Sequence, residues 1–269
     1  MKGDFHIHTS NSDCSMSPGE VFALARARGI THLSITDHDT VYGIKAHQKL
    51  AGTFDLHYIP GIEISAYDYD RQIPCHIVGL YVHDRDEALN AMIRKTTEQR
   101  HENSIRQIQR LIALGYDISF SDFENKRGIH GIYKQHIMDV LIEKGYATEF
   151  YGDFYQKMFK NKGPLDLAIE YPSHTEAVRV LKAMGAIPIL AHPTLYGNLE
   201  SVPELVEAGL LAVETCYPSL QEEDRPTVME LVQTYGLASS GGSDFHGAYA
   251  KESNAALGTC YIENFSLLK

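Results

Sequence analysis

The sequence feature that most constrains this chain is a pair of histidines, one residue apart, close to its start. The apolar Phe5 and Ile7 alternate with His6 and His8. This period of two predicts a strand with both imidazoles on one face. Neutral imidazole is the commonest metal ligand in proteins and suits Zn, Mn, Fe and Ni. The pair is therefore half of a candidate metal site, although two histidines on a solvated strand face would give the same pattern.

The composition narrows the class of protein. The chain has 269 residues, 43% hydrophobic and 22% charged, as is usual for soluble globular domains. The formal net charge of −11 argues against a broad nucleic-acid footprint. No apolar run is long enough for a membrane span and the first strand starts almost at once, so we expect neither a signal peptide nor a membrane partner. The four cysteines lack a Cys-x-x-Cys pair, which favours a reducing, cytoplasmic location.

Strands and helices alternate along most of the chain. Ser17 and Glu20 form the capping pattern of a helix start. We expect further strands at 32–36, 58–65 with an interruption at Pro60-Gly61, 75–81, 186–191, 210–214 and 257–262. We expect helices at 18–29, 41–50, 173–184, 202–208 and 222–235. Six or seven strands alternating with helices predict an α/β fold of the β/α-barrel type, with an open doubly wound sheet as the alternative.

The pattern changes between residues 84 and 171, where helical periodicity replaces the strand runs. Leu89, Met92 and Ile93 give one apolar stripe, and Ile137, Val140 and Leu141 give another. We interpret 84–171 as a helical insertion that covers the active site. The barrel domain is then made of residues 1–83 and 172–269.

Histidines and carboxylates recur near the ends of the expected strands. In a barrel these ends meet at one rim. Each residue alone has an ordinary explanation, such as a core histidine or a turn carboxylate, but their joint placement favours a site for two or three divalent ions with Glu63 as a bridge. The nine candidate metal ligands are His6, His8, Asp13, His38, Glu63, His76, His192, Asp244 and His246.

These motifs together resemble the signature of the PHP (polymerase and histidinol phosphatase) phosphoesterases. The matching runs are His6-x-His8, Ser12-Asp13, Ile35-Thr36-Asp37-His38-Asp39-Thr40, Pro60-Gly61-Ile62-Glu63, His76, Ala191-His192-Pro193 and Gly242-Ser243-Asp244-x-His246. The resemblance implies a distorted seven-stranded β/α barrel with up to three metals, Mn, Zn or Fe. The implied shells are His6, His8, Glu63 and Asp244; Asp13, His38 and His246; and Glu63, His76 and His192. Asp37 and Asp39 are expected to accept hydrogen bonds from ligand histidines.

The insertion carries the expected substrate contacts. The similar branch, which contains 3′,5′-nucleoside bisphosphate phosphatases and a 5′-to-3′ exoribonuclease, commonly has an Arg-x-His pair where this chain has Lys134-Gln135-His136. The arginine that tends to follow His-Pro in that branch is also missing here. We therefore expect Lys134 and His136 to bind substrate phosphate, and Asp244, His192 and His136 to act in catalysis.

The resemblance implies a metal-dependent phosphoester hydrolase of a small phosphorylated metabolite. A nucleoside 3′,5′-bisphosphate is the leading substrate, followed by a phosphoribosyl cyclic phosphate and then by histidinol phosphate. Two further possibilities are a 5′-to-3′ exoribonuclease acting on short RNA and a non-catalytic metal-binding module. The exoribonuclease is kept because of a modest basic cluster in the insertion, formed by Lys126, Arg127, Lys134, Lys157, Lys160 and Lys162.

Overall fold

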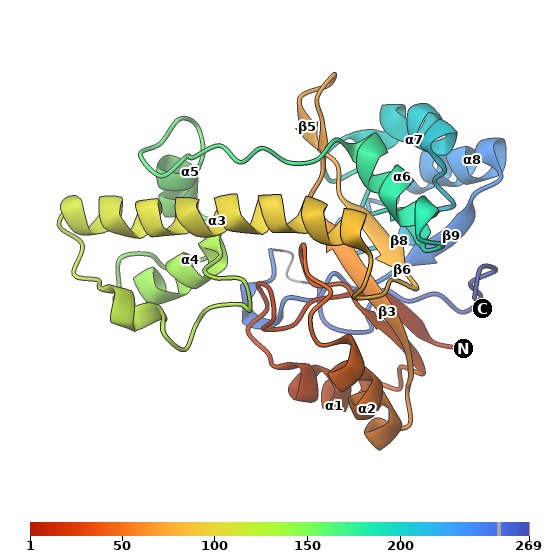
Figure 1. Ribbon diagram of the computed structural model, residues 1–269, viewed down its shortest axis with the longest axis horizontal. Coiled ribbons are helices and arrows are strands. Elements are labelled where there is room, and N and C mark those ends of the chain that lie inside the picture. Colours follow the sequence, from red (N-terminus) through yellow and green to blue (C-terminus); the bar gives the residue numbers. More distant parts are fainter. Residues whose placement is uncertain (252–253, 269) are drawn as a thin grey trace.

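A seven-stranded sheet forms the centre of the molecule (Figure 1). The computed structural model describes residues 1–251 and 254–268. In spatial order the strands are β1 (Gly3–Ile7), β2 (His32–Ile35), β3 (His57–Ile64), β6 (Ile77–Leu80), β7 (Ile187–Leu190), β8 (Ala212–Cys216) and β9 (Ala238–Gly241). A separate two-stranded sheet joins β4 (Tyr67–Asp68) to β5 (Ile73–Pro74).

The sheet curls until its first and last strands almost meet. Ile7 of β1 bridges Phe245, just beyond β9, and the His8 amide donates to the Phe245 carbonyl at 3.0 Å. Neighbouring strands are parallel except for β6, which is antiparallel to both β3 and β7. The expected seven-stranded β/α barrel is thus confirmed, and the reversed β6 is one source of its distortion.

One expected strand is wrong. Residues 257–262 form turns, and Ile262 is held to Gly3 by an isolated bridge. The seventh strand is instead β9, whose Ala-Ser-Ser-Gly sequence has little intrinsic strand propensity. A Cβ on Gly241 would collide with the Cys216 carbonyl of β8, so close backbone approach selects the small residue.

The expected interruption of the third strand is also wrong. β3 runs continuously through Pro60 and Gly61. Pro60 still pairs with Ile35 of β2, and a side chain at Gly61 would collide with Ser34. The glycine therefore serves close strand packing rather than a turn.

Helices from the described part of the chain pack around the sheet: α1 (Pro18–Ala27), α2 (Ile44–Phe54), α6 (His174–Ala183), α7 (Val202–Ala208) and α8 (Arg225–Tyr235). The expected capping box of Ser17 and Glu20 starts α1. Phe22 of α1 belongs to one apolar cluster with Leu33 of β2, and Leu181 of α6 belongs to another with Ile77 of β6. Two 3-10 helices, η2 (Asn198–Ser201) and η3 (Gly247–Tyr249), follow β7 and β9.

Residues 84–171, called the cap below, are helical. They contain α3 (Glu87–Ala113), η1 (Phe120–Phe123), α4 (Lys134–Glu143) and α5 (Asp153–Phe159). The far part of α3 packs with α4 and α5 around an apolar cluster of their own, which includes Ile108, Phe123, Ile137 and Phe159. In Figure 1 this part extends well beyond the barrel. The assignment of the cap as an insertion into the barrel domain stays a prediction.

No described helix combines the length and the apolar character that crossing a membrane requires.

Candidate metal centre and substrate cavity

The nine candidate ligands come together at one rim of the barrel. Three groups of side chains each bring their ligand atoms within 4.8 Å of one another. The groups are His6, His8, Glu63 and Asp244; His8, Asp13, His38 and His246; and His38, Glu63 and His76. The first group equals the first shell implied by the resemblance, the second group contains the whole second shell, and the third group contains the third shell except His192.

Glu63 at the end of β3 lies at the centre of the cluster. Its Oε2 is 3.2 Å from His6 Nε2, 3.3 Å from His8 Nε2 and 3.1 Å from His38 Nδ1. Its Oε1 is 2.9 Å from His76 Nδ1 and 3.0 Å from His192 Nε2. Each carboxylate oxygen thus faces a different set of imidazoles, which is the geometry that a bridging carboxylate requires.

His76 reaches the rim for a reason that the sequence pattern did not contain. It precedes β6 rather than following it. Because β6 is antiparallel to β3, the start of β6 lies level with the end of β3, where Ile77 pairs with Ile64. The reversed strand therefore delivers His76 to the same rim as the ligands that follow parallel strands.

The donor set fits divalent metal ions. Several buried atoms in it make no hydrogen bond within the described part of the chain, among them His6 Nε2, both ring nitrogens of His8, Asp13 Oδ1 and Glu63 Oε2. Buried polar atoms normally have partners, so this concentration needs a cause. Imidazole nitrogens with carboxylate oxygens suit Zn, Mn and Fe.

The electrostatics of the cluster favour positive charge within it. Burial raises the pKa of Asp13, but the adjacent His38 and His246 outweigh burial and leave that pKa well below its usual range. Burial likewise lowers the pKa of His8, yet the neighbouring carboxylates of Asp244 and Glu63 outweigh it and raise that pKa to about 10. The same carboxylates would stabilise a bound metal cation, which takes the place of the proton on the imidazole.

Two of the candidate ligands adopt strained backbone conformations. His192 has φ 28° and Asp244 has φ 47°. Positive φ is uncommon for residues other than glycine and is typical of functional sites, where the surrounding structure holds the strain. Both residues follow a strand directly or after a short turn, so the strain re-aims their side chains toward the rim.

Glu214 of β8 is a supporting residue that sequence reasoning missed. It is buried, with its Oε1 2.8 Å from His6 Nδ1, and its Oε2 accepts a hydrogen bond from the His192 amide at 2.7 Å. This fixes the His6 ring with Nε2 directed at Glu63 and Asp244. The sequence contained one indication of this role, which is a single glutamate within the apolar segment that predicts a buried strand.

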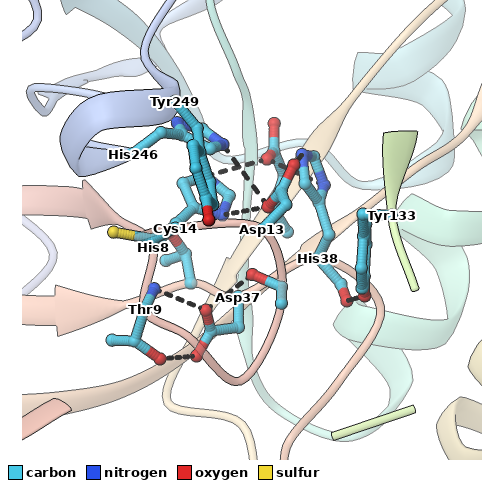
Figure 2. A network of polar contacts seen from close by, with 12 residues as sticks. His8, Thr9, Asp13, Cys14, Asp37, His38, Tyr133, His246 and Tyr249 are labelled. Atoms are coloured by element: carbon cyan, nitrogen blue, oxygen red, sulfur yellow. Dashed lines mark hydrogen bonds and ion pairs between the residues drawn. The ribbon is translucent and has the colours of Figure 1, made fainter. Parts of the chain in front are cut away.

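Asp37 and Asp39 do not play the role expected of them. Asp37 accepts hydrogen bonds from the Thr9 amide and hydroxyl, at 2.7 Å each, and from the Ser12 hydroxyl at 2.7 Å (Figure 2). It therefore shapes the loop that presents Asp13, rather than orienting a histidine. Asp39 accepts from Arg100 of the cap at 2.6 Å and from the Ser65 amide at 3.0 Å.

A cavity of about 290 Å³ opens onto the cluster. Seven of the candidate ligands line it: Asp13, His38, Glu63, His76, His192, Asp244 and His246. The cap contributes Arg100, Lys134 and several tyrosines to the lining of this cavity. Burial, followed by the nearby Lys160, lowers the pKa of Lys134 to about 8. Lys134 is therefore mainly a cation at pH 7; the nearby Asp166 acts on it electrostatically, but no ion pair of Lys134 is found among the described residues.

His136 is not among the residues that line this cavity. It is buried, and its Nδ1 accepts a hydrogen bond from the Tyr133 amide at 3.1 Å at the start of α4. Its ring packs against Tyr133 and Tyr249. Burial lowers the pKa of His136 to about 4, so the ring is neutral at pH 7.

The barrel, the histidine and carboxylate cluster and the cation-bearing cavity define a metal-dependent phosphoester hydrolase. Residues 4–187 match the PHP domain. The chain belongs to the PHP family.

Known proteins resemble the chain over almost its whole length. A phosphoribosyl 1,2-cyclic phosphate 1,2-diphosphodiesterase from Eggerthella lenta is 36% identical over 92% of this chain and 95% of its own. A 3′,5′-nucleoside bisphosphate phosphatase from Chromobacterium violaceum is 27% identical over 90% of this chain and 86% of its own. A solved structure from Bifidobacterium adolescentis, described as a metal-dependent phosphoesterase, matches 96% of this chain and 91% of its own with a TM-score of 0.85 at 24% identity. This last likeness supports the fold.

Proposed function

We propose that this enzyme hydrolyses a small sugar phosphate that carries a cyclic phosphodiester, with phosphoribosyl 1,2-cyclic phosphate as the leading substrate. The observation that carries the proposal is a candidate metal centre that opens onto a cavity of about 290 Å³, which Arg100 and Lys134 of the cap also line. The 36% identity to the Eggerthella lenta enzyme supports this choice of substrate. The order of candidates thereby changes from that suggested by the sequence, in which the bisphosphate led.

The nine rim residues would hold two or three divalent ions, with Mn, Zn or Fe as the candidates. When bound, such ions lower the pKa of water and neutralise charge that develops on phosphate. Asp244 is the most exposed carboxylate of the cluster, with 27% of its side chain accessible. We assign it to orient the attacking water from the cavity side. His192 would fix Glu63 through the 3.0 Å contact between its Nε2 and Glu63 Oε1.

The cap residues would bind the substrate. Lys134 lines the cavity as a cation and is assigned to a phosphate oxygen. His136 neither lines the cavity nor carries a proton near pH 7. We therefore assign His136 to holding the start of α4, and with it Lys134, instead of to proton transfer.

A nucleoside 3′,5′-bisphosphate is the second candidate, because Lys134 occupies the place of a phosphate-binding arginine and the Chromobacterium violaceum relative bears that name. RNA is less well supported. Lys126, part of the basic cluster, is neutralised by Asp139 and Glu143, each at 2.6 Å from its Nζ.

Turnover of a substrate panel by the Mn²⁺-loaded protein tests the proposal. The panel contains phosphoribosyl 1,2-cyclic phosphate, adenosine 3′,5′-bisphosphate, histidinol phosphate and a short 5′-phosphorylated RNA. Product mass is the readout for the cyclic ester and the RNA, because opening a cyclic ester adds water without releasing phosphate, and phosphate release is the readout for the two monoester substrates. We expect the highest kcat/KM on the cyclic ester. A higher value on the bisphosphate or the RNA would overturn the substrate assignment, and no turnover of any member would favour the non-catalytic module.

A further inference from the structure

The inner face of α3 is polar where a packed helix is normally apolar. Arg100, Asn103, Ser104 and Gln107 are spaced three and four residues apart and so share one face. All four line the cavity above the metal centre. Polar side chains on an inward face cost free energy of folding unless each buried polar atom finds a hydrogen-bond partner.

Three of these side chains are held in place by backbone carbonyls of the cap. Asn103 donates to Ala168 at 2.7 Å, Ser104 to Ile132 at 2.6 Å and Gln107 to Leu165 at 2.8 Å. Gln107 Oε1 is nevertheless buried without a hydrogen-bond partner in the described part of the chain. The wall is therefore rigid and retains unused hydrogen-bonding capacity.

Arg100 is the charged member of this face. Its Nη2 donates to Asp39 Oδ2 at 2.6 Å and to the Ser65 hydroxyl at 3.1 Å. Its guanidinium lies over the Tyr133 ring, 4.9 Å from the centroid, and the Tyr171 hydroxyl is a further neighbour. These contacts fix the guanidinium, whereas Nη1 is buried and has no hydrogen-bond partner among the described residues.

A fixed guanidinium with an unused nitrogen suits an anionic oxygen. Nη1 can donate a charge-assisted hydrogen bond to a phosphate oxygen, and the guanidinium loses little entropy in doing so because its other contacts already hold it. Arg100 borders the same cavity as Lys134 but comes from a different helix. The cap thus contributes two cations, one from α3 and one from α4, to the cavity that opens onto the candidate metal centre.

We propose that Arg100 and the polar face of α3 form the subsite for a second, non-reacting phosphate of the substrate and its neighbouring hydroxyl groups. This inference rests on the proposed function, because it takes the metal centre as the place where the other phosphate reacts. The subsite selects small esters with an anionic group at a distance from the scissile bond. Arg100 is a specificity-determining residue in this scheme.

Paired substrates test the subsite. The cyclic substrate proposed above is compared with the same cyclic ester lacking its 5-phosphate, using wild type, Arg100→Gln, Arg100→Lys and the control Arg106→Gln. Arg106 lies on the same helix but is exposed and pairs only with Glu102, at 3.5 Å, among the described residues. A charged hydrogen bond corresponds to about a 10- to 150-fold effect, so Arg100→Gln is expected to raise KM by that factor on the two-phosphate ester.

The other outcomes discriminate between roles. The ester without the 5-phosphate should lose less than about threefold in kcat/KM, and Arg100→Lys should recover part of the loss because it keeps a cation. An equal loss on both esters would show that Arg100 acts through Asp39 on the metal loop, and would overturn the subsite. No loss on either ester would overturn it as well.

A binding measurement separates the subsite from the proposed reaction. Ribose 5-phosphate is titrated calorimetrically into wild-type protein, Arg100→Gln and Arg106→Gln, with thermal unfolding as the check that each is folded. Weaker binding by Arg100→Gln alone supports the subsite even if the cyclic ester proves not to be a substrate. Equal binding by all three proteins, or no binding by wild type at millimolar concentration, refutes it.

Discussion

Replacing Glu214 by glutamine should weaken metal binding without unfolding the barrel. The buried carboxylate faces two N–H groups, using one oxygen for His6 Nδ1 at 2.8 Å and the other for the His192 amide at 2.7 Å. A glutamine of the same size offers one acceptor and one donor. One of the two N–H groups would then face an NH₂ group, or the His6 ring would turn and lose its direction toward Glu63.

The magnitude follows from this lost contact. Residues that orient a metal ligand typically contribute about 10- to 100-fold in metal affinity. That range corresponds to about 1.4–2.7 kcal/mol. It agrees with the roughly 1.5–3 kcal/mol expected for one hydrogen bond to a charged group. We therefore expect the dissociation constant of the most tightly bound ion to rise by one to two orders of magnitude.

Competition with a chromophoric chelator measures the affinity directly. Glu222→Gln is the matched control, since Glu222 is exposed and, within the described chain, pairs with Arg225 at 3.2 Å on the surface. Thermal unfolding of the metal-free proteins reports whether Glu214→Gln is folded. Unchanged metal affinity in folded Glu214→Gln would refute the reasoning, as would an equal loss in Glu222→Gln.

Three further predictions concern the metals and the cap. Protein purified without chelator should contain more than one equivalent of metal by elemental analysis, and chelation should lower Tm because the ions bind only the folded state; one equivalent or less after reconstitution would contradict a multinuclear centre. Asp244→Ala and His8→Ala should each abolish p-nitrophenyl phosphate turnover with an unchanged circular dichroism spectrum, and wild-type kcat at saturating metal would remove that residue from the ligand set. Because the pKa of Lys134 is about 8, its positive charge is present below that pH and lost above it, so KM for a two-phosphate ester should rise from pH 7 to 9. Lys134→Ala should show a high KM at every pH in this range. An identical pH profile of KM in both proteins would contradict the assignment.

The metal ligands can be proposed from the sequence because they occur in short local motifs. His6 and His8 alternate along one strand, and Asp244 and His246 repeat that spacing after another. The alternation of apolar and polar residues, however, does not indicate whether a strand runs parallel or antiparallel to its neighbours in the sheet. The pattern predicts His76 at a strand end, but this residue precedes a strand that runs the other way. Its position at the rim therefore depends on the sheet topology, which local motifs do not encode.

The errors and omissions have a common physical cause, which is that tertiary contacts outweigh local preference. β9 has no sequence signal of its own because the space beside β8 and β1 demands small residues: a Cβ on Gly241 would collide with Cys216, and one on Gly242 with His6. Arg100 and Glu214 are single polar residues in otherwise ordinary helix and strand segments. Their roles arise from partners far away in the sequence, such as Asp39 and His6.

The reversed strand also determines how the cap is carried. β6 ends level with the start of β7, where Leu80 pairs with Ile187, so the chain leaves the sheet at the rim away from the metals. The 27-residue α3, about 40 Å long, brings it back. The helix is anchored at two points. Leu89 near its start packs in the barrel core, and Arg100 near its middle pairs with Asp39 of the barrel. Ile108 and Leu111 near its end pack in the apolar cluster of the cap. The part of the cap beyond Arg100 can therefore change in size while both anchoring contacts stay in place. Substrate choice can then change without any change in the metal ligands.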